Sequence, residues 1–245
     1  VAIERVAPDR TGRLGQPDVI VILLDAARAD AFSPFGGPHE TPAVARLAAD
    51  GTVFRSAVAG SSWTLPSVSG MLTGLHADTL GVGAWKDRLP DGVPTLPELM
   101  TSAGYRSVLF SQHPFYAYET SFKRGFKRFR TLRGKNNTEL PRRQELMARN
   151  RKRRTFALVH LLPPHTPYTP PAPFRGRHTA DYTGDMTVDA THLNSFHPTD
   201  SERPSKDDVD YVLGRYLENV AYADSLVGGV LGSLDRHGRY DDALV

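Results

Sequence analysis

Six branched aliphatic residues in a row, Val19 to Leu24, are followed directly by an acid, Asp25. A strand-length run with no polar alternation is typical of a strand buried on both faces, as in the parallel sheets of α/β proteins. Ligands of such sheets bind beyond the carboxyl ends of the strands. The run therefore predicts a central strand, and it places Asp25 at the edge of the sheet where a site is expected.

The rest of the chain alternates between strand-like and helix-like segments. We expect strands over 19–24, 52–58, 106–111 and 155–161, and helices over 42–50, 66–74, 94–103 and 206–236. This alternation predicts an α/β fold, a three-layer sandwich with a mainly parallel central sheet and helices on both faces. With 40% hydrophobic content, 245 residues suffice for one substantial core, so we expect one domain over 17–245 behind an N-terminal extension over 1–16.

Hydroxyl residues precede the predicted helix over 66–74. Pro66 suits the first turn of a helix, which leaves Thr64 or Leu65 as the N-cap beside the amide groups of that end. The amino end of a helix attracts anions, including phosphate and sulfate esters. A threonine hydroxyl becomes a nucleophile once a base or a metal takes its proton. Thr64 therefore has two interpretations, an ordinary cap or a nucleophile activated by a carboxylate-bound cation.

Several segments together, in order and spacing, resemble the sulfatase branch of the alkaline-phosphatase superfamily. They are PDVIVILLDAARAD (17–30), Thr41-Pro42, GTVF (51–54), WTLPSVSGMLTGL (63–75) and VHLLPPHTPY (159–168). The resemblance covers almost the whole chain from Pro17 onward. It implies an alkaline-phosphatase-like fold and a hydrolase or transferase that acts on a small-molecule or polymeric sulfate or phosphate ester.

The same resemblance assigns roles to three residues. It implies that Asp25 and Thr64 are ligands of a divalent cation, which could be Ca, Mg, Mn or Zn, and that Thr64 is also the nucleophile. It implies that His165 contacts the ester group or the leaving oxygen. The reaction expected is a pair of displacements through a covalent phospho- or sulfo-threonine, with water or an alcohol as the second acceptor.

Three further residues are candidate substrate contacts. The resemblance makes His160 a companion of His165, and His113 follows the predicted strand over 106–111 at the same edge of the sheet. Arg28 lies close behind Asp25 and could meet the substrate. The alternatives are a surface pair of Arg28 with Asp30 and a hydrogen-bonded loop histidine at position 113.

The chain departs from the sulfatase pattern at two places. Classical sulfatases carry Cys or Ser at the nucleophile and Arg four residues on, whereas this chain has Thr64 and Val68, so a formylglycine mechanism is not expected. The second acid that often follows the first Asp is replaced by Ala26. Direct attack by the threonine alkoxide is favoured, and a non-catalytic protein that has lost its metal is the alternative.

The family places an Asp-His-Gly motif after a strand that follows the long helix. The sequence ends at 242–245, inside the expected strand. We therefore expect the remaining metal ligands beyond Val245 and interpret the chain as a fragment of a longer enzyme.

The basic residues are unevenly distributed. The segment over 121–154 holds 14 of the 30 Lys and Arg residues and only two acids, Glu139 and Glu145. Such a segment is either a solvated surface or a surface that attracts a polyanion, such as a phospholipid layer or nucleic acid. Nucleic acid is the less favoured partner, because no aromatic residues for base stacking are interleaved after Phe129. A polyanion-binding module is thus a second alternative function.

Two other features limit what the chain can be. Residues 174–205 are polar and form an insertion, interpreted as a loop in preference to a lid over the site. No apolar run approaches the roughly 20 residues of a membrane span. The absence of cysteine excludes disulfides and a thiolate nucleophile.

Overall fold

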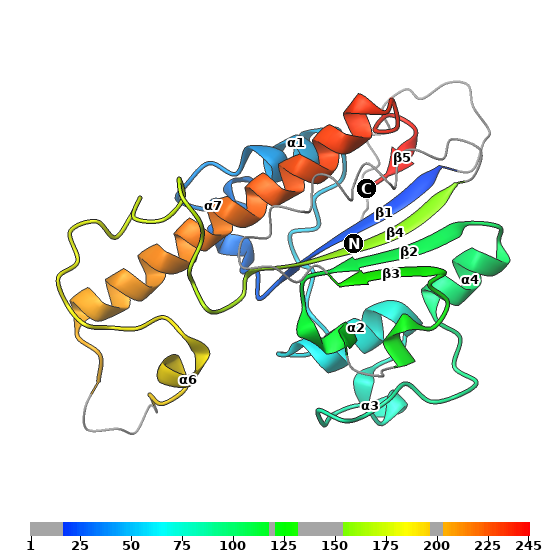
Figure 1. The fold of residues 1–245 in the computed structure, drawn as a ribbon, viewed down its shortest axis with the longest axis horizontal. Helices are drawn as coiled ribbons and strands as arrows, with labels where there is room; N and C mark the ends of the chain where they lie inside the picture. The colour runs from blue at the N-terminus through cyan, green and yellow to red at the C-terminus, as the bar shows by residue number, and fades with distance from the viewer. Residues whose placement is uncertain (1–16, 118–120, 132–153, 197–202) are drawn as a thin grey trace. The chain divides into compact units, whose positions relative to one another are not determined.

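The computed structural model describes residues 17–117, 121–131, 154–196 and 203–245. Its centre is a five-stranded sheet with the strand order β3-β2-β4-β1-β5 (Figure 1). β2 pairs in parallel with β3 and β4, and β1 pairs in parallel with β5, which confirms the predicted parallel sheet. The strands are β1 (Asp18–Asp25), β2 (Arg106–Ser111), β3 (Arg128–Thr131), β4 (Thr155–Pro164) and β5 (Ala243–Leu244).

The helices of the described residues include all four that the sequence predicts. Two of these match the predicted ranges, and the other two begin within two residues of them. The α-helices are α1 (Pro42–Asp50), α2 (Thr64–Thr73), α3 (Ala77–Leu80), α4 (Leu96–Ser102), α6 (Ala190–Leu193) and α7 (Lys206–Arg236). Short 3-10 turns occur at η1 (Ala29–Ala31), η2 (Ser33–Phe35), η3 (Pro114–Ala117) and η4 (Ser121–Lys123).

The predicted strand over 52–58 is wrong. These residues form no strand, and their apolar side chains include Phe54, 65% exposed, and Val58, 92% exposed. Apolar and polar residues alternate there, but a strand also needs a partner. The outer position beside β1 is taken instead by β5.

Two other strands differ from the prediction. β3 was not predicted, because arginines occupy its exposed positions; its half-buried Phe129 lies opposite Leu109 of β2. β4 continues to Pro164, three residues beyond the predicted strand over 155–161. The register of β4 with β2 ends at His160, so neither Pro163 nor Pro164 removes a hydrogen bond from that ladder.

The described chain forms two compact units. Unit 1 comprises residues up to Leu23 together with Leu47–Leu161 and Gly229–Val245. Unit 2 comprises Leu24–Arg46 and Leu162–Gly228. Each unit has its own cluster of buried hydrophobic residues.

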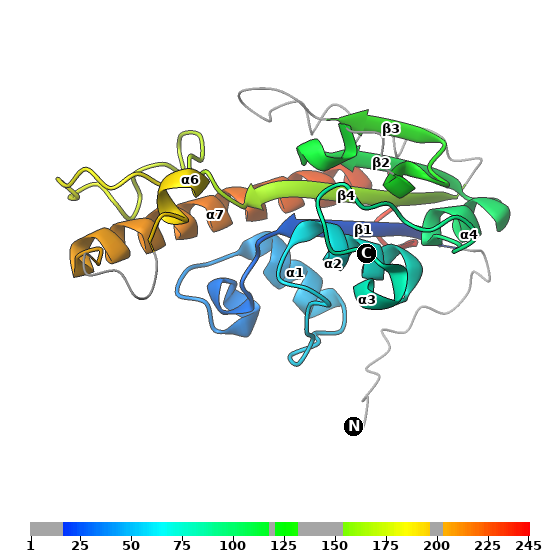
Figure 2. The same cartoon turned by 90° about the horizontal axis from the view of Figure 1, so that it is seen from below.

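The core of unit 1 lies between the sheet and α2. Leu65, Val68 and Leu72 follow the spacing of one helix face and pack in one buried cluster with Leu109 of β2 and Leu158 of β4. Figures 1 and 2 draw α3 and α4 on the same side of the strands as α2. The alternate residues of β2 and β4 are buried as well, so both faces of the sheet are covered and the predicted three-layer α/β fold is confirmed.

The core of unit 2 joins the first half of α7 to the segment that follows β1. Tyr216 and Val220 of α7 cluster with Ala31 and Phe32. Further along α7, the Asp224 carboxylate accepts hydrogen bonds from the amides of Ala43 (3.2 Å) and Val44 (2.9 Å) at the start of α1. Burial raises the pKa of Asp224, and these two amide bonds oppose that rise.

Among the helices of the described residues, none is long and apolar enough to cross a membrane. Much of the basic segment over 121–154 lies outside the described residues, as do residues 197–202 of the polar insertion. The described part of that insertion consists mainly of turns and the short helix α6.

A buried ion pair holds the amino ends of three strands of unit 1. Asp18 begins β1 and is 2% exposed; its Oδ1 accepts the amide of Thr155, the first residue of β4, at 2.6 Å. Its Oδ2 is paired with the guanidinium of Arg239, which is 6% exposed and precedes β5. One carboxylate therefore satisfies a backbone donor and a cation that come from distant parts of the sequence.

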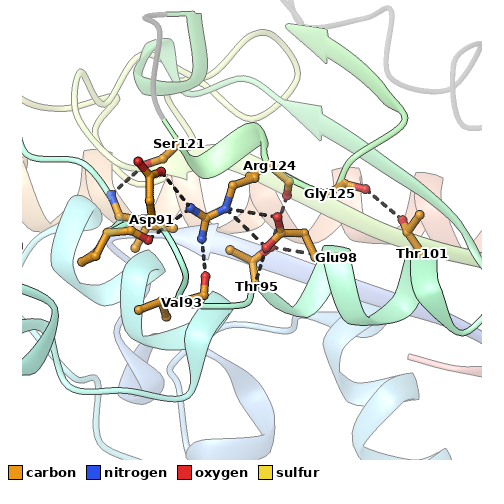
Figure 3. A network of polar contacts seen from close by, with 10 residues as sticks. Asp91, Val93, Thr95, Glu98, Thr101, Ser121, Arg124 and Gly125 are labelled. Atoms are coloured by element: carbon orange, nitrogen blue, oxygen red, sulfur yellow. Dashed lines mark hydrogen bonds and ion pairs between the residues drawn. The ribbon is translucent and has the colours of Figure 1, made fainter.

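Arg124 forms the centre of a second polar network in unit 1 (Figure 3). Its guanidinium donates to Glu98 (3.3 Å) and to the carbonyl oxygens of Pro90 (3.1 Å) and Val93. Glu98 also accepts the amide of Thr95 at 2.8 Å and completes a capping box at the start of α4. This arginine of the basic segment is thus engaged inside the fold.

The Asp18–Arg239 pair is expected to be strongly coupled. Arg239→Met should lower the free energy of unfolding by about 3–5 kcal/mol, because the Asp18 carboxylate stays buried without its cation. The double variant Asp18→Asn/Arg239→Met should lose less than the sum of the two single variants, as measured by chemical denaturation. Lys206→Met, which removes an exposed pair with Asp210, is the control and should cost at most about 0.5 kcal/mol. Additive losses in the double variant would contradict the coupling.

Glu98 is expected to contribute to stability against acid. Partial burial alone would raise the pKa of Glu98, but the hydrogen bonds from Thr95 and the charge of Arg124 outweigh it and lower the pKa below its ordinary value. The folded state therefore holds its proton less tightly than the unfolded state. The resulting stabilisation is present above the ordinary glutamate pKa of about 4.3 and is lost as the pH falls through the folded pKa.

Glu98→Gln should flatten the acid side of the stability profile measured by urea denaturation across that range. Glu40→Gln, at an exposed position, should change the free energy of unfolding by no more than about 0.5 kcal/mol. An unchanged acid slope in Glu98→Gln would show that this network does not contribute.

Candidate active site

Thr64 is the first residue of α2 in unit 1. Trp63 is the N-cap, with extended dihedral angles, so the prediction that Thr64 or Leu65 caps the helix is wrong by one residue. Thr64 is half-buried, and Pro66, which has no amide hydrogen, is buried in the first turn. The amides of this turn are therefore those of Thr64 and Leu65, and the hydroxyl of Thr64 lies at the positive end of the helix dipole.

Two candidate histidines of unit 1 form a buried stack near the carboxyl end of β2, where His113 follows β2 and His160 lies within β4 opposite Ser111. The ring centroids of His113 and His160 are 5.4 Å apart with an angle of 7° between the planes. His113 is 5% exposed and His160 is 0% exposed, and His160 Nδ1 lies 3.2 Å from the hydroxyl of Tyr116. His113 Nδ1 accepts the amide of Phe115 at 3.1 Å, so the neutral ring carries its proton on Nε2. The structure brings these two residues together, and their contact with substrate stays a prediction.

Asp25 ends β1 and is followed by a strained turn in unit 2. Ala26 has a φ angle of 58°. Among the residues that the structure describes, no other non-glycine residue has a positive φ angle. The hydroxyl of Tyr216, on α7, donates to the carbonyl oxygen of Ala26 (3.1 Å) and accepts the amide of Arg28 (2.9 Å). Burial raises the pKa of Tyr216, which keeps the phenol protonated and able to donate. One buried hydroxyl therefore closes the turn behind Asp25.

The Arg28 side chain forms a bidentate pair with Asp30. Its Nε lies 3.0 Å from Asp30 Oδ1 and its Nη2 lies 2.7 Å from Oδ2. The two side chains are 62% and 66% exposed, as the surface-pair interpretation expects. Hydrogen bonding and charge raise the pKa of Arg28 and lower that of Asp30.

His165 follows the end of β4 in unit 2. Its Nδ1 lies 2.6 Å from the carbonyl oxygen of Thr166, and since a carbonyl can only accept, the neutral ring carries its proton on Nδ1. Asn219 of α7 donates to the carbonyl oxygen of His165 at 3.2 Å. The Nδ1 contact orients the ring and leaves Nε2 as the atom that carries the lone pair, while the Asn219 contact holds the backbone of His165.

The candidate residues are thus divided between the two units. Thr64, His113 and His160 belong to unit 1, whereas Asp25, Arg28 and His165 belong to unit 2. In the part of the chain that the structure describes, no three His, Asp or Glu side chains form a group that could hold a metal ion. The described residues therefore contain no complete ligand group for the predicted divalent cation.

Sequence reasoning missed the residues that support the site. Tyr216 is 190 residues from Ala26, and Tyr116 follows β2 within an aromatic-rich segment. Neither lies in a segment that carries the family resemblance, and a tyrosine on an amphipathic helix is usually assigned to the core. Only the folded chain reveals that these hydroxyls serve the backbone turn and the buried imidazole.

The fold resembles that of known enzymes. The parallel sheet with helices on both faces is alkaline-phosphatase-like. It is similar to the phosphonate monoester hydrolase of Agrobacterium radiobacter, with a TM-score of 0.71 and 19% identity over 93% of this chain and 61% of that one. It is also similar to the C-terminal periplasmic domain of EcEptC from Escherichia coli, solved with Zn, with a TM-score of 0.65 and 16% identity over 91% of this chain and 60% of that domain.

The sequence comparison narrows that class to one family. The model of the sulfatase family matches residues 17–245, and the chain belongs to this family. It is 33% identical over 106 residues to an arylsulfatase of Klebsiella aerogenes, an alignment that covers 38% of this chain and 23% of that enzyme. The chain spans less than two thirds of each of these relatives.

The hydroxyl of Tyr216 is expected to hold the turn behind Asp25. Tyr216→Phe keeps the ring but removes both hydrogen bonds, so the Arg28 amide should exchange its hydrogen faster and the free energy of unfolding should fall by about 1–3 kcal/mol. Hydrogen exchange resolved at single residues measures the effect. Tyr168→Phe is the matched control, because that ring packs edge-on against Tyr216 at 5.5 Å and should leave Arg28 exchange unchanged. Equal exchange of the Arg28 amide in the two variants would show that the Tyr216 hydroxyl does not stabilise this turn.

Proposed function

We propose that the protein hydrolyses or transfers a sulfate or phosphate ester through the hydroxyl of Thr64. The observation that carries the proposal is the position of Thr64 as the first residue of α2, where the helix dipole and first-turn amides favour a tetrahedral anion. Family membership supports the reaction class. A threonine cannot form the aldehyde that an oxidised cysteine or serine gives, so the direct alkoxide route is the one proposed.

The proposed reaction has two displacements. In the first, the Thr64 hydroxyl gives its proton to a water molecule, and its Oγ1 forms a bond to the sulfur or phosphorus atom while the bond to the leaving oxygen breaks. In the second, a water molecule or an acceptor alcohol attacks the sulfur or phosphorus atom of the sulfo- or phospho-threonine, the bond to Oγ1 breaks, and Oγ1 takes back a proton from water, which restores Thr64. The donors at the start of α2 would stabilise the charge that grows on the non-bridging oxygens.

His165 is the proposed acid for the leaving group. The contact of Nδ1 with the Thr166 carbonyl leaves Nε2 as the exchanging atom, so the imidazolium would give its Nε2 proton to the leaving oxygen. The neutral ring could then accept a proton from the attacking water in the second step. The cycle returns the histidine to its starting form.

A divalent cation, when bound, would neutralise ester charge and lower the pKa of the nucleophile. Asp25 is the predicted ligand within this chain. The other ligands of the cation are not found as a group among the described residues.

The polyanion-binding alternative has less support. Arg124, within the basic segment, is 23% exposed and directed into hydrogen bonds with Glu98 and nearby carbonyl oxygens. Exposed arginines on β3 remain available, but they share their strand with half-buried residues that serve the sheet. The larger part of the segment lies outside the described residues.

Thr64→Ala is expected to lower ester hydrolysis by at least about 10³-fold in the full-length protein, because the nucleophile is removed. Thr64→Ser keeps the hydroxyl and should retain part of the activity. Rates with aryl phosphates, phosphodiesters and aryl sulfates in the presence of divalent cations measure the effect. Ser62→Ala, which removes an exposed hydroxyl two residues away, is the control. Turnover that survives in Thr64→Ala would assign the nucleophile elsewhere.

A further inference from the structure

A cavity of about 430 Å³ lies in unit 2 between the first half of α7 and the turn that follows Asp25. Its volume is within the range of small-molecule sites, roughly 300–1,000 Å³. Aliphatic and aromatic side chains form most of its wall, and two of its residues, Ala26 and Arg28, come from the turn itself. The cavity therefore begins one residue after the carboxylate predicted to serve the reaction.

One wall of the cavity is an apolar stripe on α7. Val209, Val212, Leu213 and Tyr216 line the cavity and follow the i, i+3, i+4, i+7 spacing of one helix face. Val209 is 53% exposed and Leu213 is 44% exposed, which is unusual for large aliphatic residues that share a face with a buried tyrosine. Exposed apolar groups gathered around a cavity mark a binding site.

The cavity is lined by two charged residues, Arg28 and Asp208, whose side chains have different partners. The Asp30 carboxylate accepts hydrogen bonds from Nε and Nη2 of Arg28. The opposite edge of the guanidinium, which carries Nη1, could bind an anion. Asp208 also lines the cavity, but its carboxylate accepts hydrogen bonds from Tyr182 and Ser205. One cation at the turn and one carboxylate away from it suit a ligand with a single anionic end.

We propose that this cavity binds the apolar organic group of the ester substrate, an aryl or alkyl group that fits within about 430 Å³. The proposal rests on the proposed function, because it assigns the charged end of that ester to the side of Asp25 and Arg28. An aliphatic wall offers few partners for the hydroxyl groups of a sugar, so an apolar ester is preferred over a sulfated sugar.

A non-hydrolysable probe tests the cavity without catalysis. Naphthalenesulfonate has an apolar body and an anionic end joined by a carbon–sulfur bond, and its binding can be followed by fluorescence or calorimetry. Wild-type protein and Thr64→Ala should bind it equally, whereas Leu213→Asp should weaken its Kd by at least about tenfold. Leu99→Asp alters a similarly exposed leucine, 55% exposed on α4 in unit 1, and should leave the Kd unchanged.

Two further measurements sharpen the test. Leu213→Ala should weaken binding in the same direction without a buried charge, so a misfolded Leu213→Asp protein would not decide the outcome. Arg28→Met should weaken naphthalenesulfonate more than naphthalenemethanol, which has no charge. Inorganic sulfate and glucose sulfate should bind more weakly than naphthalenesulfonate.

The outcomes separate this proposal from the proposed function. Loss of probe binding in both Leu213 variants, with no ester hydrolysis by any form of the protein, would support the cavity and reject the reaction. A Kd within twofold of wild type in both variants, or tighter binding of glucose sulfate, would overturn the cavity proposal even if Thr64-dependent hydrolysis is observed.

Discussion

The sheet of unit 1 depends on the buried carboxylate of Asp18. It begins β1, accepts the first amide of β4 and pairs with Arg239 ahead of β5, so three segments that are far apart in sequence are joined by one group. A buried carboxylate is tolerated only when its charge and its lone pairs are satisfied, and here both partners come from the segments that must assemble. The contact fixes where β1 and β4 start, and therefore how far along the sheet their carboxyl ends reach.

In unit 2 the corresponding role belongs to α7. Tyr216 bonds to the turn behind Asp25, Asn219 bonds to the carbonyl of His165, and Asp224 bonds to the first amides of α1. Each of these three residues satisfies backbone groups of another segment of unit 2. A single rigid helix thus holds two candidate site residues and the start of a neighbouring helix. Polar contacts of this kind give a loop one conformation, which apolar packing alone does much less effectively.

Much of the fold could be predicted from the sequence, because its signals were local. The aliphatic run before Asp25 and the Thr41-Pro42 start of α1 mark their elements without reference to the rest of the chain. The strand expected over 52–58 failed because alternation says nothing about whether a neighbour is available, and β3 was hidden by its arginines. Of the site, the candidate residues could be named, but the stacking of His113 on His160 and the bridge from Tyr216 join residues that share no local pattern.

The conformation of Ala26 bears on how this chain can vary. A positive φ angle of 58° is one that glycine, asparagine and aspartate adopt more readily than alanine, and that β-branched residues avoid. The shape of the turn is therefore imposed by its surroundings, chiefly the Tyr216 hydroxyl, and not by the residue at its centre. An aspartate at position 26 would fit the existing backbone with less strain than alanine does. The turn therefore has a backbone suited to a carboxylate at position 26, and introducing one there would require a change of side chain alone.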